Sequence, residues 1–272
     1  MIRAPWASVR KRIWSRVRVV APMRDNVAMS DFPQPARAAW GEFPDVLIHA
    51  DEGATKRHPD YAAAKAGDVR AAKQLVADIL DAPAVARLRR MIGGRDVILA
   101  PVHAVEASGV NRIPAVMAEL LGERIGAPVA REIVQSNRVG HTGASGYQRL
   151  AFPPLFEGDV SRGQEYFLVD DFVGQGGTLA NLKGFIEQAG GRVAGATTLT
   201  GKPYSAKLAL DSQTLTRLRE KHGTELEKWW KRRYGYGFDV LTESEARYLE
   251  RADDADLIRN RIAQARSGAN AS

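Results

Sequence analysis

Residues 166–178 read YFLVDDFVGQGGT, and no other stretch of the 272-residue chain says as much about its fold. An apolar run leads into two adjacent carboxylates, Asp170 and Asp171, and a glycine-rich turn then ends at Thr178. The apolar run predicts a buried strand, and the apolar periodicity after Thr178 predicts a helix that begins there. If this strand belongs to a parallel sheet flanked by helices, its carboxyl end lies at the edge where ligands bind.

The turn between the carboxylates and the helix has the composition of a phosphate-binding loop. Its glycines let backbone N–H groups converge on an anion, and the helix N-terminus adds the positive end of the helix dipole. The threonine adds a hydroxyl donor. We therefore expect a phosphate monoester to be held by the five residues of this turn, Gly174, Gln175, Gly176, Gly177 and Thr178.

Two neighbouring carboxylates beside a phosphate-binding turn suggest a second ligand group. Asp170 and Asp171 repel each other, but both can accept hydrogen bonds from adjacent hydroxyls of a sugar. A ribose 5-phosphate offers such a diol close to its phosphate, and we expect the two acids to bind the ribose. The plainer alternative is a solvated strand end whose acids cap the following helix.

Outward from this stretch, short apolar runs alternate with segments of helical spacing. The runs occupy residues 96–100, 127–134, 166–169 and 193–199. Residues 113–121 and 179–189 repeat apolar side chains at i, i+3 and i+4, and Gly190 and Gly191 mark the end of the second helix. The alternation predicts an α/β protein with a doubly wound, mostly parallel sheet.

Helical additions flank this core on both sides. Residues 58–80 predict two helices, separated where Gly67 ends the first and Asp68 caps the second. Beyond residue 202 the sequence predicts helices, one of them opened by a capping box at residues 242–245. The expected organisation is a basic head, a mostly helical N-terminal segment, a core and a helical C-terminal extension, at 1–28, 29–94, 95–203 and 204–272.

The net charge of +7 is concentrated at one end of the chain. Residues 1–24 contain seven basic and no acidic side chains, which leaves 32 basic and 32 acidic residues in the remainder. The body is neutral by count, and this argues against nucleic acid as a partner. The head fits a targeting segment, a membrane-surface or nucleic-acid arm, or an upstream extension of a reading frame that starts at Met29.

The chain contains no cysteine, which excludes disulfides, thiolate zinc sites and cysteine nucleophiles. The absence also fits a reducing compartment. No run of 18 apolar residues occurs, so the sequence predicts no transmembrane helix. We therefore expect a cytoplasmic protein without membrane contact.

Residues 166–178 resemble the motif with which type I phosphoribosyltransferases bind 5-phosphoribosyl-1-pyrophosphate (PRPP): an apolar strand, two acids and a loop ending in Gly-x-Thr. A looser resemblance extends over residues 95–203. It implies transfer of ribose 5-phosphate from PRPP to an acceptor, usually a nitrogen, with Mg²⁺ as cofactor and Asp170 and Asp171 as catalytic residues. Gln175 departs from the family, many of whose members carry a hydroxyl residue there. The dinucleotide GxGxxG and the GxxxxGK[ST] patterns do not match, which disfavours a Rossmann-type oxidoreductase.

The resemblance also assigns two loops. The pyrophosphate loop would comprise Pro101, Val102, His103 and Ala104, without the family's usual basic or glycine-rich sequence. A mobile flap would correspond to residues 135–149, with candidate phosphate ligands Arg138, His141 and Arg149. No protein ligand for the metal is identified, because Mg²⁺ would be held largely by oxygens of the substrate.

Several alternatives remain open. The atypical pyrophosphate loop and Gln175 also fit a regulatory module that binds PRPP or a nucleotide without turnover. An enzyme of a conflict system could instead modify a macromolecule, docked through the aromatic and basic stretch 228–236, although such a stretch more often packs as core. Residues 56–61 either simply begin a helix or form part of a hood over the acceptor. We expect a small-molecule acceptor and, by default, a homodimer.

Overall fold

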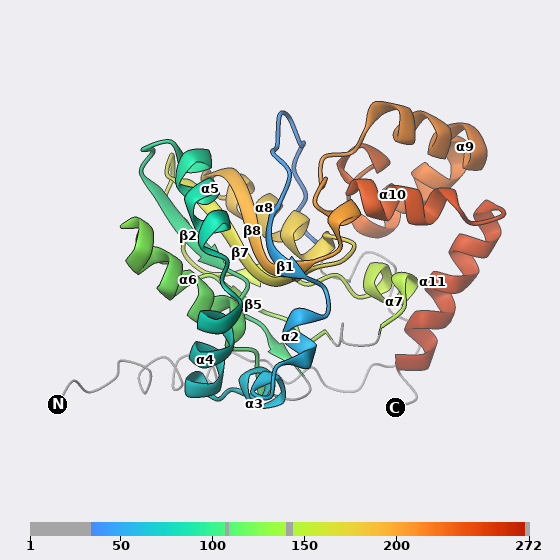
Figure 1. The fold of residues 1–272 in the computed structure, drawn as a ribbon. Coiled ribbons are helices and arrows are strands. Elements are labelled where there is room, and N and C mark those ends of the chain that lie inside the picture. The colour runs from blue at the N-terminus through green and yellow to red at the C-terminus, as the bar shows by residue number, and fades with distance from the viewer. Residues whose placement is uncertain (1–33, 107–108, 140–143, 270–272) are drawn as a thin grey trace. The chain divides into compact units, whose positions relative to one another are not determined.

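We describe the protein from a computed structural model that covers residues 34–106, 109–139 and 144–269. At its centre is a four-stranded sheet in which every neighbouring pair is parallel (Figure 1). In spatial order the strands are β1 (Leu47–Asp51), β8 (Arg192–Gly201), β7 (Glu165–Val173) and β2 (Val97–Pro101). The predicted α/β class with a parallel sheet is confirmed.

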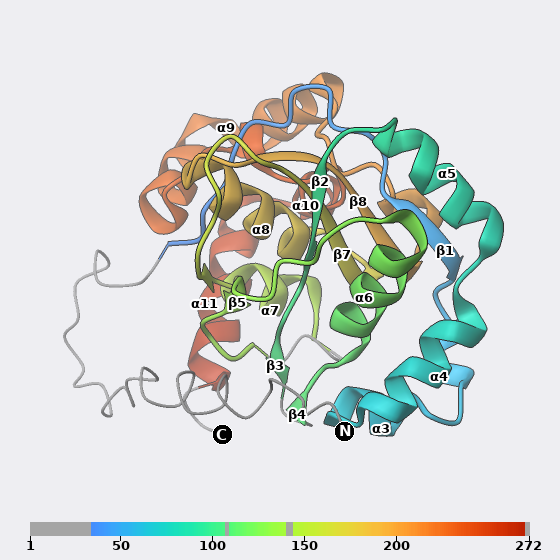
Figure 2. The same cartoon turned by 90° about the vertical axis from the view of Figure 1, so that its left-hand side faces the viewer.

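Strand β7 sends alternate side chains to opposite faces of the sheet, as a strand buried on both sides must. Phe167 and Val169 belong to one apolar cluster, and Tyr166 and Leu168 belong to another. The first cluster includes side chains of α4 (Val69–Ile79), α5 (Ala82–Ile92) and α6 (Ile113–Ile125), and the second those of α8 (Gly177–Gln188). Helices therefore cover both faces, and Figure 2 shows α6 and α8 on opposite sides of the sheet.

Parallel pairing gathers the carboxyl ends of the strands at one edge. Pro101, the last residue of β2, pairs with Val169, so β7 continues beyond the end of its neighbour. Asp170 and Asp171 lie in this continuation, opposite β8, where Asp170 pairs with Thr198. The sheet topology thus brings both acids to the edge at which ligands bind in parallel α/β proteins.

Two expectations about strands need correction. The sequence analysis missed β1, a sheet strand within the mostly helical segment 29–94, because only its tertiary pairing with β8 distinguishes this short run from a loop. The expected strand at 127–134 is reduced to a bridge between Leu99 and Val129 and to β5 (Val134–Gln135), which pairs with β6 (Phe156–Glu157). Pro128 has no N–H to donate, and pairing with β2 is limited to two backbone hydrogen bonds, Leu99 N–H to Pro128 O and Ala130 N–H to Leu99 O.

Two short helices follow β1. These are α2 (Ala54–Arg57) and α3 (Tyr61–Ala66). Gly67 ends α3 in a left-handed conformation with φ +115°, and the carboxylate of Asp68 caps α4, as predicted. After β2, a hairpin of β3 (Val105–Glu106) and β4 (Gly109–Val110) leads into α6.

The C-terminal extension consists of helices packed around their own apolar core. Its elements are η1 (Pro203–Ser205), α9 (Ser212–Tyr234), η2 (Phe238–Val240), α10 (Glu243–Glu250) and α11 (Ala255–Ala269). The same core includes side chains of α7 (Gly146–Ala151). Thr242 and Glu245 form the predicted capping box of α10. Trp230, in the aromatic and basic stretch, is fully buried against Tyr234 and Phe238, so the core interpretation of that stretch is confirmed for its central tryptophan.

Among the helices of the described ranges, none is both long enough and apolar enough to cross a membrane.

Candidate functional site

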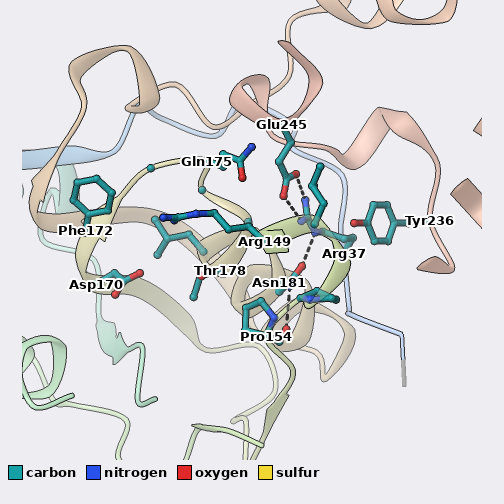
Figure 3. A pocket seen from close by; sticks show the side chains of 16 residues that line it. Arg37, Arg149, Pro154, Asp170, Phe172, Gln175, Thr178, Asn181, Tyr236 and Glu245 are labelled. Atoms are coloured by element: carbon teal, nitrogen blue, oxygen red, sulfur yellow. Dashed lines mark hydrogen bonds and ion pairs between the residues drawn. The ribbon is translucent and has the colours of Figure 1, made fainter. Parts of the chain in front are cut away.

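The two acids of the motif lie side by side at the sheet edge. Asp170 is 6% exposed, and its Oδ1 accepts a 2.8 Å hydrogen bond from the backbone N–H of Asp171. Both side chains line one cleft, and Asp170 also lines an adjoining pocket at the start of α8 (Figure 3). Asp170 therefore faces both halves of the site.

Asp171 is held by two side chains that the sequence analysis did not identify. Its Oδ2 lies 3.1 Å from Nζ of Lys65 on α3 and accepts a 3.0 Å hydrogen bond from Nδ2 of Asn111. Thr200 on β8 donates to its backbone oxygen at 3.1 Å. Lys65 and Asn111 precede the acid by 106 and 60 residues, so no local motif could have revealed them.

The pKa values of the two carboxyl groups are shifted in opposite directions. Burial, and after it the negative charge of Asp171, raises the pKa of Asp170 well above its ordinary value. Burial also acts to raise the pKa of Asp171, but Lys65 and Asn111 outweigh it, so that this pKa is lowered. Asp171 is thus the ionised member and Asp170 the proton-accepting member of a coupled pair.

The turn that follows presents an open cradle of backbone donors. Gly176 has φ +79° and opens α8 without a capping side chain. Within the described part of the chain, the N–H groups of residues 174–178 donate no hydrogen bond to another protein group. Residues 174–178 line the pocket with Asp170, so unsatisfied donors and the positive end of the α8 dipole converge there.

Residues of the C-terminal extension contact this turn. Thr242 Oγ1 donates to the carbonyl of Gln175 at 2.5 Å, and a Cβ on Gly177 would lie 2.5 Å from Glu245 Oε1. Glu245 is neutralised by Arg37, whose guanidinium makes two bonds of 2.8 and 2.9 Å to its carboxylate (Figure 3). Because the buried charge is paired, it does not repel an anion at the turn.

The second part of the cleft lies between the sheet edge and the first helices. Its walls include the side chains of Thr55, Lys56, Tyr61 and Lys65. Of the stretch 56–61 only the first and last residues face the cleft, since Arg57 pairs with Asp51 and His58 with Asp78. Lys56 and Tyr61 therefore border the cleft, and a hood over an acceptor stays a prediction.

The expected pyrophosphate loop borders the same cleft only in part. Val102 and Ala104 line it, whereas Pro101 is the last residue of β2 and His103 is not among the lining residues. The carbonyl of His103 accepts from the Gln135 N–H at 2.9 Å, and burial followed by the charge of Arg112 lowers the pKa of its imidazole. The lowered pKa favours the neutral imidazole of His103. The N–H groups of His103 and Ala104 have no partner among the described residues.

The three flap candidates have different positions. Arg149, on α7, reaches the pocket, the cleft and an adjoining groove, and burial lowers the pKa of its guanidinium. Arg138 is exposed and lines none of the three. His141 lies outside the described residues.

The described residues contain no cluster of three or more His, Cys, Asp or Glu side chains that could enclose a metal ion. Asp170 is the acid whose carboxylate faces both the pocket and the cleft. A hard cation such as Mg²⁺, which keeps several waters and binds few carboxylates, fits this donor set when a substrate supplies further oxygens.

Comparisons with known proteins identify relatives but no family, and no protein-family model matches the chain. The chain is 44% identical over 241 residues to Protein TraN of Escherichia coli, a match that covers 89% of this chain and 54% of TraN. It is 41% identical over 154 residues to an uncharacterized protein of Haemophilus influenzae, covering 56% of this chain and 34% of that protein. The chain thus spans about half the length of TraN.

Among solved structures, the chain matches an orotate phosphoribosyltransferase of Mycobacterium tuberculosis in complex with Fe(III) dicitrate. The match covers 53% of this chain and 79% of the other, with 15% sequence identity and a TM-score of 0.24. A likeness this low carries no argument about fold or activity, so the functional argument rests on the site alone.

Proposed function

We propose that this protein is a magnesium-dependent phosphoribosyltransferase that transfers ribose 5-phosphate from PRPP to an acceptor with release of pyrophosphate. One observation carries the proposal. A buried acid that faces the cleft, Asp170, stands next to a turn of unpartnered N–H groups, residues 174–178, at the ligand-binding edge of a parallel sheet.

The 5-phosphate would bind at the turn. Backbone N–H groups and the Thr178 hydroxyl are donors of the kind that phosphate oxygens accept, and charge-assisted bonds are worth about 1.5–3 kcal/mol each. Asp170 would accept hydrogen bonds from the ribose hydroxyls. Asp171 would act differently from Asp170, because Lys65 and Asn111 already bind its carboxylate. Its role would be to fix the position of α3 relative to β7.

The pyrophosphate would bind on the other side of the cleft. There the N–H groups of His103 and Ala104 are unpartnered among the described residues, and the side chain of Lys56 lines the wall. Magnesium, when bound, neutralises charge on the leaving pyrophosphate. In the reaction, the C1′–O bond would break with its electron pair leaving on pyrophosphate, and a lone pair of the acceptor nitrogen would form the new C1′–N bond. An acceptor nitrogen that carries a hydrogen would then lose its proton to solvent.

The chain's own contribution would be positioning and exclusion of water rather than covalent catalysis. The turn holds one end of the substrate and the loop after β2 the other, so that C1′ faces the acceptor between them. Burial of Asp170 keeps the ribose hydroxyls in a site of low dielectric, where hydrogen bonds are stronger.

A second candidate is a module that binds PRPP without turnover. The observation that favours it is the engagement of Asp171 by Lys65 and Asn111, which leaves a single carboxylate for the ribose diol. Both candidates predict PRPP binding, and only the first predicts pyrophosphate release in the presence of an acceptor.

The test is calorimetric titration with PRPP, with and without Mg²⁺, on the wild type and on Asp170→Asn. Asp159→Asn is the matched control, because it makes the same change of carboxyl to amide at an exposed position. We expect magnesium-dependent binding that Asp170→Asn weakens about tenfold, because Mg²⁺ and the ribose hydroxyls would favour the ionised form of Asp170, whose charge-assisted bonds an amide cannot make. If the folded wild type binds no PRPP, the proposal is wrong; binding without pyrophosphate release across a panel of nitrogen acceptors leaves the second candidate.

A further inference from the structure

An open groove adjoins the cleft on the side of the C-terminal extension. It begins at Phe172 and Arg149, which line both, and continues along η1 and α10. Its volume of about 980 Å³ is several times the 160 Å³ of the cleft. The side chains that concern the argument are Lys56, Lys202, Tyr204, Arg247, Tyr248 and Arg251. We call this feature the basic groove.

The charged residues that line the basic groove are mostly positive. Five basic residues line it, and Glu52 is the one acid among the described residues that do so. Lys202 lies 3.5 Å from Glu52, and Arg247 lies 3.6 Å from Glu243. Neither Lys56 nor Arg251 has an ion pair within the described ranges. The five cations come from α2, from α7, from the residue after β8, and from α10 and its C-cap, so they are spread along the groove rather than gathered around one point.

An exposed aromatic ring stands among these cations. Tyr204 is 60% exposed, and it is one of two large hydrophobic side chains exposed in the described structure. Lys202 Nζ lies 5.8 Å from its ring centroid, and Arg247 donates to its backbone oxygen at 3.0 Å. The ring of Tyr204 is thus largely exposed and lies beside a cation, where a ligand can reach it.

We infer that the basic groove binds single-stranded nucleic acid, with backbone phosphates on its spaced cations and an unpaired base stacked on Tyr204. Spaced cations interleaved with an open aromatic ring are the pattern that tracks a nucleic-acid strand. A single small anion would use one or two of the five cations. A duplex keeps its bases stacked inside and offers none to the ring. The inference stands on the groove and does not depend on PRPP chemistry.

The test is fluorescence anisotropy of the full chain with a labelled strand of about 20 nucleotides, longer than a single-domain site. The variants are Lys202→Gln/Arg251→Gln and Tyr204→Ala. The control Lys73→Gln/Arg90→Gln removes the same charges from exposed positions on α4 and α5, which lie far from α10 in Figure 1. Every variant keeps the seven basic residues of positions 1–24, so a loss of affinity reports on the groove.

We expect Lys202→Gln/Arg251→Gln to weaken binding and to reduce the slope of log affinity against log salt by about 1.4, the contribution of two phosphate contacts. Tyr204→Ala should weaken binding about tenfold at an unchanged slope, with Tyr204→Trp restoring it. Absence of binding by the wild type, or binding that all groove variants retain, overturns the inference. Equal competition by poly-glutamate would also overturn it, and would indicate an acidic protein partner.

Discussion

Nζ of Lys65 lies 3.1 Å from Oδ2 of Asp171, although the two residues are 106 positions apart. The contact ties α3 to the central strand β7 and supplies the cation that keeps one acid of the pair ionised. Both side chains are largely buried, with exposed fractions of 12% and 15%. The first helices and the acid pair therefore form one electrostatic unit.

Lys65→Met should destabilise the protein more than an exposed ion pair would allow. Removal of one partner leaves a buried charge uncompensated, and we expect the free energy of unfolding to fall by about 3 kcal/mol, the lower end for buried pairs. Lys65→Met/Asp171→Asn should regain part of that loss. Denaturant titrations of the four proteins in this double-mutant cycle measure the coupling. Strictly additive losses would show that the pair is not coupled.

Asp170→Asn should stabilise the protein by an amount that grows with pH. The pKa of Asp170 is raised in the folded state, so the folded protein holds a proton that the unfolded chain releases. Stability of the wild type is therefore lost as pH rises through that raised pKa, and the amide variant lacks this loss. Thermal melts from about pH 4 to about pH 8 measure whether the melting temperature of Asp170→Asn rises relative to that of the wild type as pH increases. A difference in melting temperature that stays constant, as expected for Asp159→Asn, would contradict it.

His49 should make the protein sensitive to acid. It is 8% exposed on β1, where its Nε2 lies 3.1 Å from Thr197 Oγ1, and burial lowers its pKa to about 4. Between this value and 6.5, the ordinary pKa of histidine, the imidazole is protonated in the unfolded chain but not in the folded protein. Stability is therefore lost as pH falls from 6.5 to about 4. His49→Gln should flatten this part of the stability profile. Urea midpoints across the range measure it, and parallel profiles would refute the assignment.

Thr242→Ala should combine a structural and a functional loss. The hydroxyl of Thr242 caps α10 and also donates to the carbonyl of Gln175 in the phosphate-binding turn. Loss of the cap should cost about 1 kcal/mol of unfolding free energy. Asp68→Ala is the matched control, because it removes the cap of α4 away from the turn. If the proposed function holds, only Thr242→Ala weakens PRPP binding. Equal PRPP affinities for the two variants would show that the Thr242 hydroxyl does not contribute to the phosphate-binding turn.

Sequence alone predicted the motif and its surroundings because these depend on local patterns. The strand of residues 166–169, the two acids, the glycine turn and the helix after it follow one another in the chain, and β7 and α8 reproduce that order. The break at Gly67 and the capping box at Thr242 are equally local, since backbone conformation and a contact between near neighbours decide them.

Other parts of the site had no local signal. Lys65 and Asn111 are ordinary polar residues until the fold brings them to Asp171, and Arg37 is one arginine among many until it pairs with Glu245 across 208 positions. The same holds for β1, which becomes a strand only because β8 offers it an edge.

Charge shows the division most clearly. By count the chain beyond residue 24 is neutral, and that count argued against nucleic acid. Folding places Lys56, Lys202 and Arg251 along one groove and moves most acids elsewhere, which no count along the chain can express. The sequence by itself determined the pattern of polar and apolar residues along β7 and α8, the two acids and the glycine turn, because these features depend on residues that are adjacent in the chain. The tertiary structure alone decided which distant charges meet, because electrostatic interaction depends on distance in space.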